Sequence, residues 1–176
     1  MKKSSRGFSL IELLIVVAII LIIAAIAIPN LLRSRIAANQ SSAVGSLRTL
    51  NTAEVTYSTT YNTGYSSTLG DLGPGSPGAN VPNATAAGLV DEVLSGINGS
   101  GGTTGPGAMQ SAKSGYSFIY APAGTDATGK YNSYTINANP VSPGTTGTNY
   151  YFTDQSGVIR QNSTAIAGSA DSPLGG

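Results

Sequence analysis

The feature that most constrains this chain is the apolar run from Phe8 to Ile28, close to its N-terminus. Its only polar members are Ser9 and Glu12, and nothing interrupts helix formation before Pro29. About 20 apolar residues in a helix are enough to cross the hydrocarbon core of a bilayer. An ionised carboxylate in that core costs roughly 2.5–3.5 kcal/mol. The run therefore predicts a membrane-spanning helix in which Glu12 needs a partner.

The residues that precede this run indicate its orientation. Residues 1–7 are polar and contain Lys2, Lys3 and Arg6. Cytoplasmic flanks of spanning helices are enriched in lysine and arginine. We therefore expect a cytoplasmic N-terminus and an exported C-terminal part, although two arginines also follow the run and moderate the charge bias.

Composition excludes several kinds of active site. The chain has no cysteine and no histidine, so disulfide bonds, thiolate nucleophiles, zinc sites and Ser-His-Asp triads are excluded. The net charge is +1, and the basic excess lies wholly in the first seven residues. Because the remainder is slightly acidic, nucleic acid is not an expected partner. Nothing in the composition indicates a cofactor.

Beyond Pro29 the pattern changes from uniformly apolar to amphipathic. Apolar residues recur at spacings of three, four and seven, which is typical of one helical face. They are Leu32, Ile36, Ala43, Leu47 and Leu50. We therefore predict one helix from Phe8 to Tyr61 that stops near Gly64. Its first half, 8–29, is apolar all round, and its second half, 30–61, has one apolar face to bury.

The rest of the chain predicts a loop and then a small sheet. Residues 62–115 are rich in turn-forming residues and predict a long loop, with one short helix over Gly88–Gly96. Residues 116–161 contain four short β-branched and aromatic runs, which predict an antiparallel meander. These runs are Tyr116–Ala121, Ser133–Ala138, Asn149–Asp154 and Gly157–Gln161. The expected fold class is α+β: a long N-terminal helix packed on a small antiparallel sheet, followed by a tail at 162–176.

Two weak ligand-site patterns occur in the predicted turns. The stretch Gly124–Tyr131 has the glycine and lysine positions of a phosphate-binding loop, but Tyr131 stands where a magnesium-binding hydroxyl is required. Strand-like alternation follows it, so we interpret it as a turn between strands. Asp126 and Asp154 are weak candidates for a calcium site. We expect no catalytic residues, no metal site and no cofactor, and therefore no enzyme.

The N-terminus resembles the prepilin signature of type IV pilins and their secretion-system relatives. The resemblance rests on "RGFSLIE" followed by an apolar helix and "IPN". In that family a membrane peptidase cuts after the glycine and methylates the new N-terminus. The resemblance implies a leader peptide at 1–7, cleavage between Gly7 and Phe8, and N-methylation of Phe8. Glu12 is then the fifth residue of the mature chain.

The same resemblance implies a structural function. Family members start as single-pass proteins of the inner membrane, and assembly machinery there packs their apolar helices into a helical homopolymer at the cell surface. Glu12 of one subunit would face the N-terminal amine of a neighbour, so that it sets the register between subunits. The expected partners are copies of this chain, the prepilin peptidase, the inner-membrane machinery and, before assembly, the membrane. A major pilin is the expected role.

Two departures from the family pattern affect these expectations. Family members often have a glycine within the apolar helix, and this chain has none there. We therefore assign a kink or local loss of helix to Pro29 alone. The C-terminal disulfide of many members is also absent, so we expect the tail after Gln161 to be mobile.

Two alternatives remain open at this stage. A pseudopilin of a type II secretion system, or a minor pilin, has almost the same N-terminus. A secreted soluble binding domain would instead use an ordinary signal peptide, with cleavage near "AIA" at 25–27. The sequence does not indicate whether a filament serves motility, adhesion, DNA uptake, secretion or electron transfer.

Overall fold

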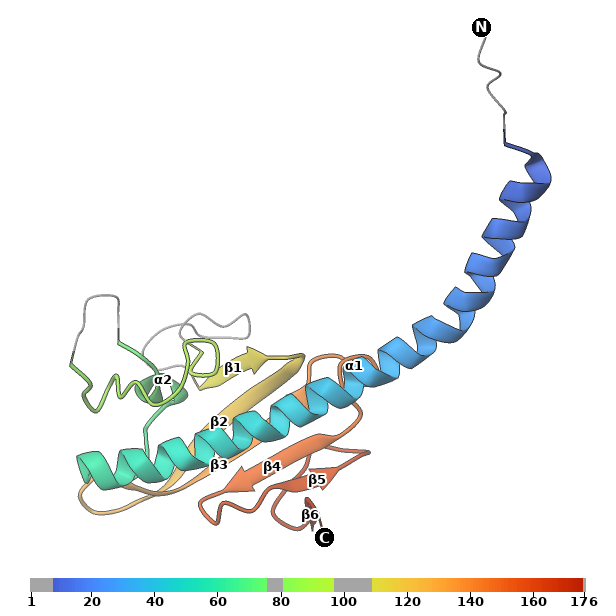
Figure 1. Cartoon of the computed structure of the whole chain (residues 1–176). Helices are drawn as coiled ribbons and strands as arrows, with labels where there is room; N and C mark the ends of the chain where they lie inside the picture. The colour runs from blue at the N-terminus through green and yellow to red at the C-terminus, as the bar shows by residue number, and fades with distance from the viewer. Residues whose placement is uncertain (1–7, 76–80, 97–108, 176) are drawn as a thin grey trace, which may run out of the picture. The chain divides into compact units, whose positions relative to one another are not determined.

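The computed structural model describes residues 8–75, 81–96 and 109–175. The predicted leader at 1–7 lies outside the described residues. The chain divides into two compact units, Met1–Arg35 and Ile36–Gly176. The first contains the apolar part of the long helix, and the second contains the rest of that helix together with a sheet (Figure 1).

The long helix α1 runs from Leu10 to Tyr61, close to the predicted bounds. The chain reverses direction directly after it, because Asn62 has a φ of 51° and Gly64 a φ of 80°. A Cβ at Gly64 would lie against the backbone carbonyl oxygen of Tyr131 and 3.0 Å from its nitrogen. Position 64 therefore requires glycine both for its backbone angle and for this close approach.

The sheet is an antiparallel meander, which confirms the predicted α+β fold. Its six strands pair in sequence order, β1 to β6. Their bounds are β1 Gln110–Lys113, β2 Tyr116–Thr125, β3 Tyr131–Pro140, β4 Tyr150–Asp154, β5 Arg160–Asn162 and β6 Ser172–Pro173. In the central ladder Phe118 lies opposite Ala138, and Ile136 lies opposite Thr153.

The strands differ from the prediction in number and length. Strands β1 and β6 were not predicted, because they contain no β-branched or aromatic residues. Strands β2 and β3 are longer than predicted, since both run for ten residues. The stretch Gly124–Tyr131 is the turn between them, as interpreted above: Asp126 Oδ1 accepts hydrogen bonds from the backbone N–H groups of Thr128 and Lys130 at 2.7 and 3.0 Å.

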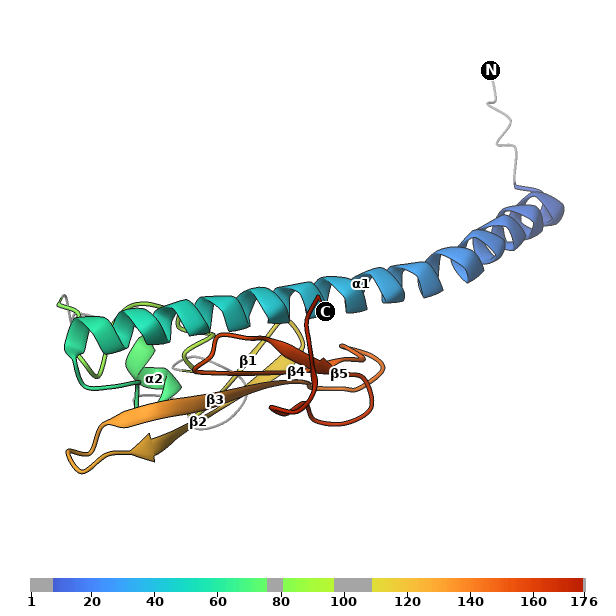
Figure 2. The ribbon, with the colours of Figure 1, turned by 90° about the horizontal axis from the view of Figure 1, so that it is seen from below.

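Within the second unit, α1 lies along one face of the sheet (Figures 1 and 2). Of the predicted helix stripe, Ala43, Leu47 and Leu50 are fully buried, whereas Ile36 is half-buried and Leu32 is exposed. Alternate residues of β2 and β3 face the helix and complete the core. The largest fully buried apolar side chains from the sheet are Tyr116, Tyr120, Tyr134, Phe118 and Ile136.

The predicted short helix over Gly88–Gly96 is wrong. This segment forms turns, and within the described residues of the connection, 62–75, 81–96 and 109, the short helix is α2, Leu69–Leu72. Leu89 and Val90 donate their backbone N–H groups to Leu72 O instead of to a helix of their own. The Asp91 carboxylate accepts from the N–H groups of Val93 and Leu94, which closes a single turn. Docking on α2 therefore overrides the weak local helical pattern.

The prediction of a mobile C-terminal tail is also wrong. Strand β6 pairs with β5, and the Leu174 N–H donates to Ile159 O at 2.7 Å. The tail has no disulfide, and polar contacts of Asp171 connect its parts instead. The Asp171 carboxylate accepts from Asn162 Nδ2 at 2.9 Å and from Gly168 N at 2.8 Å. Hydrogen bonds within the tail, and between the tail and the sheet, therefore hold it in place.

Candidate functional site

The N-terminal part of α1 presents an apolar surface on all sides. In the single chain every side chain from Phe8 to Ile28 is exposed except Ala24, which is half-buried. Phe8, the first described residue, is 87% exposed. Among the described residues, α1 is the one helix long and apolar enough to cross a membrane. Because exposed apolar surface costs about 25 cal/mol per Å² in water, this segment needs lipid or other apolar helices around it.

Glu12 has a local partner that the sequence analysis missed. Its Oε2 accepts a hydrogen bond from the Ser9 backbone N–H at 2.9 Å. Since α1 begins at Leu10, Ser9 is the N-cap, and Glu12 is the third helical residue. This is the backbone half of a capping box, and the pattern Ser-x-x-Glu was the signal for it. The carboxylate also lies at the positive end of the helix dipole.

Of the other predicted N-terminal residues, Pro29 is described and Gly7 is not. The helix continues through Pro29 without interruption. Because proline has no backbone N–H, the Ala25 carbonyl lacks its intrahelical donor, which weakens the helix at that turn. Gly7 lies outside the described residues, so cleavage at the Gly7–Phe8 bond stays a prediction.

Asp126 and Asp154, the two candidates for a calcium site, each accept hydrogen bonds within the turn in which they lie. Asp126 follows β2, and hydrogen bonds from the Thr128 hydroxyl and the Lys130 backbone N–H lower its pKa. Asp154 ends β4, and its Oδ1 accepts from Ser156 N at 2.9 Å. The described part of the chain holds no group of three or more histidine, cysteine or acidic residues suited to a metal. The structure therefore gives these aspartates a turn-closing role.

A buried carboxylate at Glu54 is the most unusual polar group in the second unit, and the sequence analysis did not predict it. Glu54 lies on the core-facing side of α1 and is fully buried. Its Oε1 lies 2.6 Å from Ser66 Oγ, within hydrogen-bond distance, and its Oε2 accepts from Ser66 N at 3.0 Å. Burial raises the pKa of this carboxyl group above its usual 4.5, against the opposing effect of the Ser66 hydrogen bonds.

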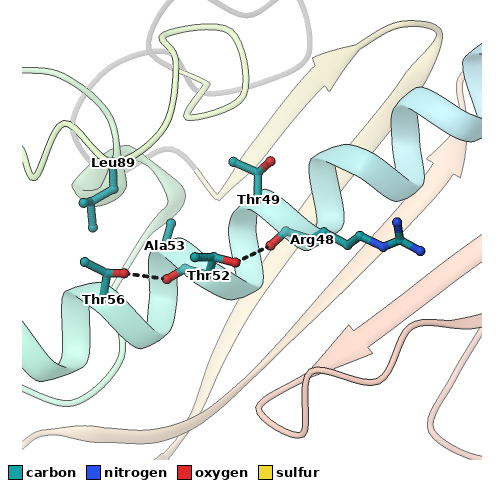
Figure 3. A pocket seen from close by; sticks show the side chains of 6 residues that line it. All are labelled: Arg48, Thr49, Thr52, Ala53, Thr56 and Leu89. Carbon is teal, nitrogen blue, oxygen red and sulfur yellow. Dashed lines mark hydrogen bonds between the residues drawn. The ribbon is translucent and has the colours of Figure 1, made fainter.

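An open pocket between α1 and the segment around Leu89 offers no catalytic arrangement (Figure 3). It is lined by Arg48, Thr49, Thr52, Ala53, Thr56 and Leu89. The Thr52 and Thr56 hydroxyls donate to carbonyls of their own helix, Arg48 O at 3.0 Å and Thr52 O at 2.8 Å. Among these residues there is no general base that would activate a hydroxyl group.

Comparison with known proteins finds one family profile and two relatives, each of which matches part of the chain. Residues 2–28 match the family profile described as the prokaryotic N-terminal methylation motif. The type IV major pilin protein PilA of Myxococcus xanthus is 53% identical over 53 residues, 30% of this chain and 24% of the relative. The type IV wide pilus major component PilA4 of Thermus thermophilus is 59% identical over 39 residues, 22% of this chain and 30% of the relative.

These matches cover limited parts of the proteins compared. The aligned segments span about a quarter to a third of the length of the two pilins. No solved structure matches the chain significantly. The family profile concerns the apolar helix and the segment before it, and the two pilins match over 53 and 39 residues.

Proposed function

We propose that this chain is the precursor of a structural subunit of a type IV pilus, most simply a major pilin. The observation that carries the proposal is the N-terminal segment. It matches the methylation motif over residues 2–28, and its apolar helix is exposed on all sides in the single chain. A helix of this kind is suited to two environments in turn, the bilayer before assembly and a bundle of identical helices afterwards.

In this proposal a prepilin peptidase cleaves between Gly7 and Phe8 and methylates the amino group of Phe8. Before cleavage the chain spans the inner membrane with residues 1–7 in the cytoplasm, in accordance with the three cations in that segment. Assembly machinery then moves the apolar helix from lipid into the filament. The second unit remains at the filament surface.

Glu12 supplies specificity in the assembled state. Its Oε2 closes the N-terminus of its own helix by accepting from Ser9 N, which leaves Oε1 for the methylated ammonium group of Phe8 on a neighbouring subunit. A buried carboxylate and ammonium tolerate each other only as a pair, and breaking such a pair costs about 3–5 kcal/mol. Docking in the wrong register is therefore strongly disfavoured.

Two substitutions of Glu12 separate its charge from its capping contact. Glu12→Gln keeps an acceptor for the Ser9 N–H but removes the charge, and Glu12→Ala removes both. We expect both variants to insert into the membrane and to be cleaved, and neither to form filaments. Filaments at the wild-type level from Glu12→Gln would contradict the charge pairing, even if Glu12→Ala fails to assemble.

Intact mass spectrometry tests the processing and the class of filament. The proposal expects a chain that starts at Phe8 with one added methyl group, recovered from sheared surface fibres. The same mass found only in membranes would favour a pseudopilin or a minor pilin. A chain that starts at Ile28 would indicate an ordinary signal peptide and would refute the proposal.

A further inference from the structure

The buried Glu54 carboxyl group lies among groups that do not supply positive charge. Around it are Asp71 on α2, Tyr120 on β2, Tyr134 on β3 and Tyr57 one turn further along α1. In the described part of the chain Glu54 makes no ion pair. A buried carboxylate without a cation is costly, and protonation is the usual way to remove that cost.

The hydrogen bonds around Glu54 form a short chain through Ser66 and Tyr120. Glu54 Oε1 lies 2.6 Å from Ser66 Oγ, which lies 3.2 Å from Tyr120 Oη. Tyr120 Oη in turn donates to the backbone carbonyl of Ser66 at 2.7 Å. Ser66 is fully buried, and Tyr120 is 2% exposed. Each hydroxyl group in the chain has one hydrogen to donate, so the hydrogens can be counted.

Every hydrogen finds an acceptor in either state of Glu54, so the preference for the neutral acid comes from full burial without a cation among the described residues. If Glu54 is ionised, the Ser66 hydroxyl donates to Oε1, and Tyr120 Oη then receives no hydrogen from Ser66. If Oε1 carries a proton, it donates to Ser66 Oγ, Ser66 Oγ donates to Tyr120 Oη, and Tyr120 Oη donates to the Ser66 carbonyl. Every hydroxyl group then both donates and accepts, while Glu54 Oε2 still accepts from Ser66 N.

We propose that Glu54 is a proton-operated latch, which as the neutral acid holds Ser66, and with it the chain that leaves α1, against strand β2. Ionisation leaves a charge in the core, and the Ser66 hydrogen bonds compensate only partly for the loss of water around it. The carboxylate therefore moves toward water, and its contact with Ser66 is lost. The inference does not depend on the proposed pilus function, because it concerns only contacts within the second unit.

The pH dependence has a definite sign. Burial raises the pKa of Glu54 in the folded chain above the 4.5 of an unperturbed glutamate. Between these two values the folded state binds more protons than the unfolded state. The stabilisation is therefore complete below about 4.5 and is lost as the pH rises through the folded pKa. Acidification over this range strengthens the latch.

The backbone amides of Tyr65 and Ser66 distinguish loss of the Glu54–Ser66 contact from a general loosening of the fold. The Ser66 N–H donates to Glu54, whereas the Tyr65 N–H donates to Tyr131 O at 2.9 Å. Above the folded pKa of Glu54 we expect the hydrogen-exchange protection of the Ser66 amide to fall by up to about tenfold per pH unit. The Tyr65 amide keeps its protection. An equal loss at both amides, or at neither, would overturn the proposal.

The experiment uses the full chain in detergent micelles, with amide exchange measured by NMR across the pH range. Glu54→Gln mimics the neutral acid and should make Ser66 protection independent of pH. Glu92→Gln removes an exposed carboxylate and serves as the matched control, with the wild-type pH dependence retained. A pH-dependent loss at Ser66 in Glu54→Gln would assign the effect to another group and refute the latch.

If Glu54→Gln fails to fold, the protonation state of Glu54 can be measured directly in the wild-type chain. The chain has three glutamates, Glu12, Glu54 and Glu92, so labelling their carboxyl carbons with ¹³C gives few signals. The signal assigned to Glu54 should report a neutral acid at a pH where an unperturbed glutamate is ionised. If the Glu54 signal titrates close to the value of an unperturbed glutamate, the proposal is wrong.

Discussion

Removing the Asn51 side chain should be among the most destabilising polar substitutions in the second unit. Asn51 joins α1 to β3, to β4 and to the turn that follows β4. Its Nδ2 donates to Thr153 Oγ1 at 2.9 Å and to Gly157 O at 3.3 Å, and its Oδ1 accepts from Tyr134 Oη at 3.1 Å. Tyr134 is 1% exposed, and Thr153 is fully buried. Asn51→Ala therefore leaves two buried hydroxyl groups without this partner.

The free energy of unfolding lost in Asn51→Ala can be estimated from the buried hydroxyl groups of Tyr134 and Thr153. A buried polar group left without its hydrogen bond costs about 1–3 kcal/mol. Two such groups cost roughly 2–6 kcal/mol, and the better helix propensity of alanine returns about 0.5 kcal/mol. Because Asn51 is itself only half-buried, water reaches part of the site, and we expect a loss of about 2–4 kcal/mol. A domain of this size has a total stability of about 5–15 kcal/mol.

Urea unfolding of the full chain in micelles measures this loss. The chain has nine tyrosines and no tryptophan, so near-ultraviolet circular dichroism of the tyrosines reports the unfolding of the sheet. With a slope of about 1–3 kcal/mol per M, the midpoint should fall by about 1–2 M urea. Thr52→Ala is the control, because the Thr52 hydroxyl bonds only within its own helix, to Arg48 O.

A double-mutant cycle with Tyr134→Phe tests the reasoning itself. If the Asn51–Tyr134 hydrogen bond is responsible, the double variant is less destabilised than the sum of the single variants, by about 0.5–3 kcal/mol. A loss below about 1 kcal/mol for Asn51→Ala, or strict additivity in the cycle, would refute the assigned role.

Two further predictions concern the packing between α1 and the sheet. Leu47→Ala removes a fully buried side chain and should cost about 2–5 kcal/mol in urea unfolding, whereas Val55→Ala, at a position 54% exposed on the same helix, should cost little. Gly147→Ala should destabilise by about 1–3 kcal/mol, because its Cβ would meet Tyr116 Oη and lie 2.7 Å from Tyr116 Cε2. Gly168→Ala, with nothing within 4 Å of the added Cβ, should leave the unfolding midpoint near that of the wild type.

The sequence predicted the features that rest on long, regular patterns. The apolar run and the helical stripe that follows it fixed α1 nearly to its ends, because many residues repeat the same signal. The central strands were also predictable, since β2 and β3 alternate large buried residues such as Phe118 and Ile136 with more exposed ones. Their lengths were not, because Pro122 and Gly124 look like strand breakers and yet belong to β2.

The features that the sequence did not predict depend on contacts between distant residues. Strand β6 contains only Ser172 and Pro173, and its pairing depends on where β5 places its edge. The turns at 88–96 depend on docking against Leu72 O, which lies far away along the chain. Neither contact leaves a periodic pattern in its own segment. Local propensity is a weak guide in such places because tertiary contacts override it.

Glu12 and Glu54 show why the same residue type was predictable at one position and hidden at the other. Glu12 was conspicuous because it is a charge within an apolar run, and its partner Ser9 is three residues away. Glu54 lies in a polar stretch of α1, where a glutamate looks like an ordinary exposed helix residue. Its burial depends on Ser66, twelve residues further along, and on Tyr120 on the opposite layer. A buried acid of this kind becomes visible only when the helix, the loop and the sheet are in place together.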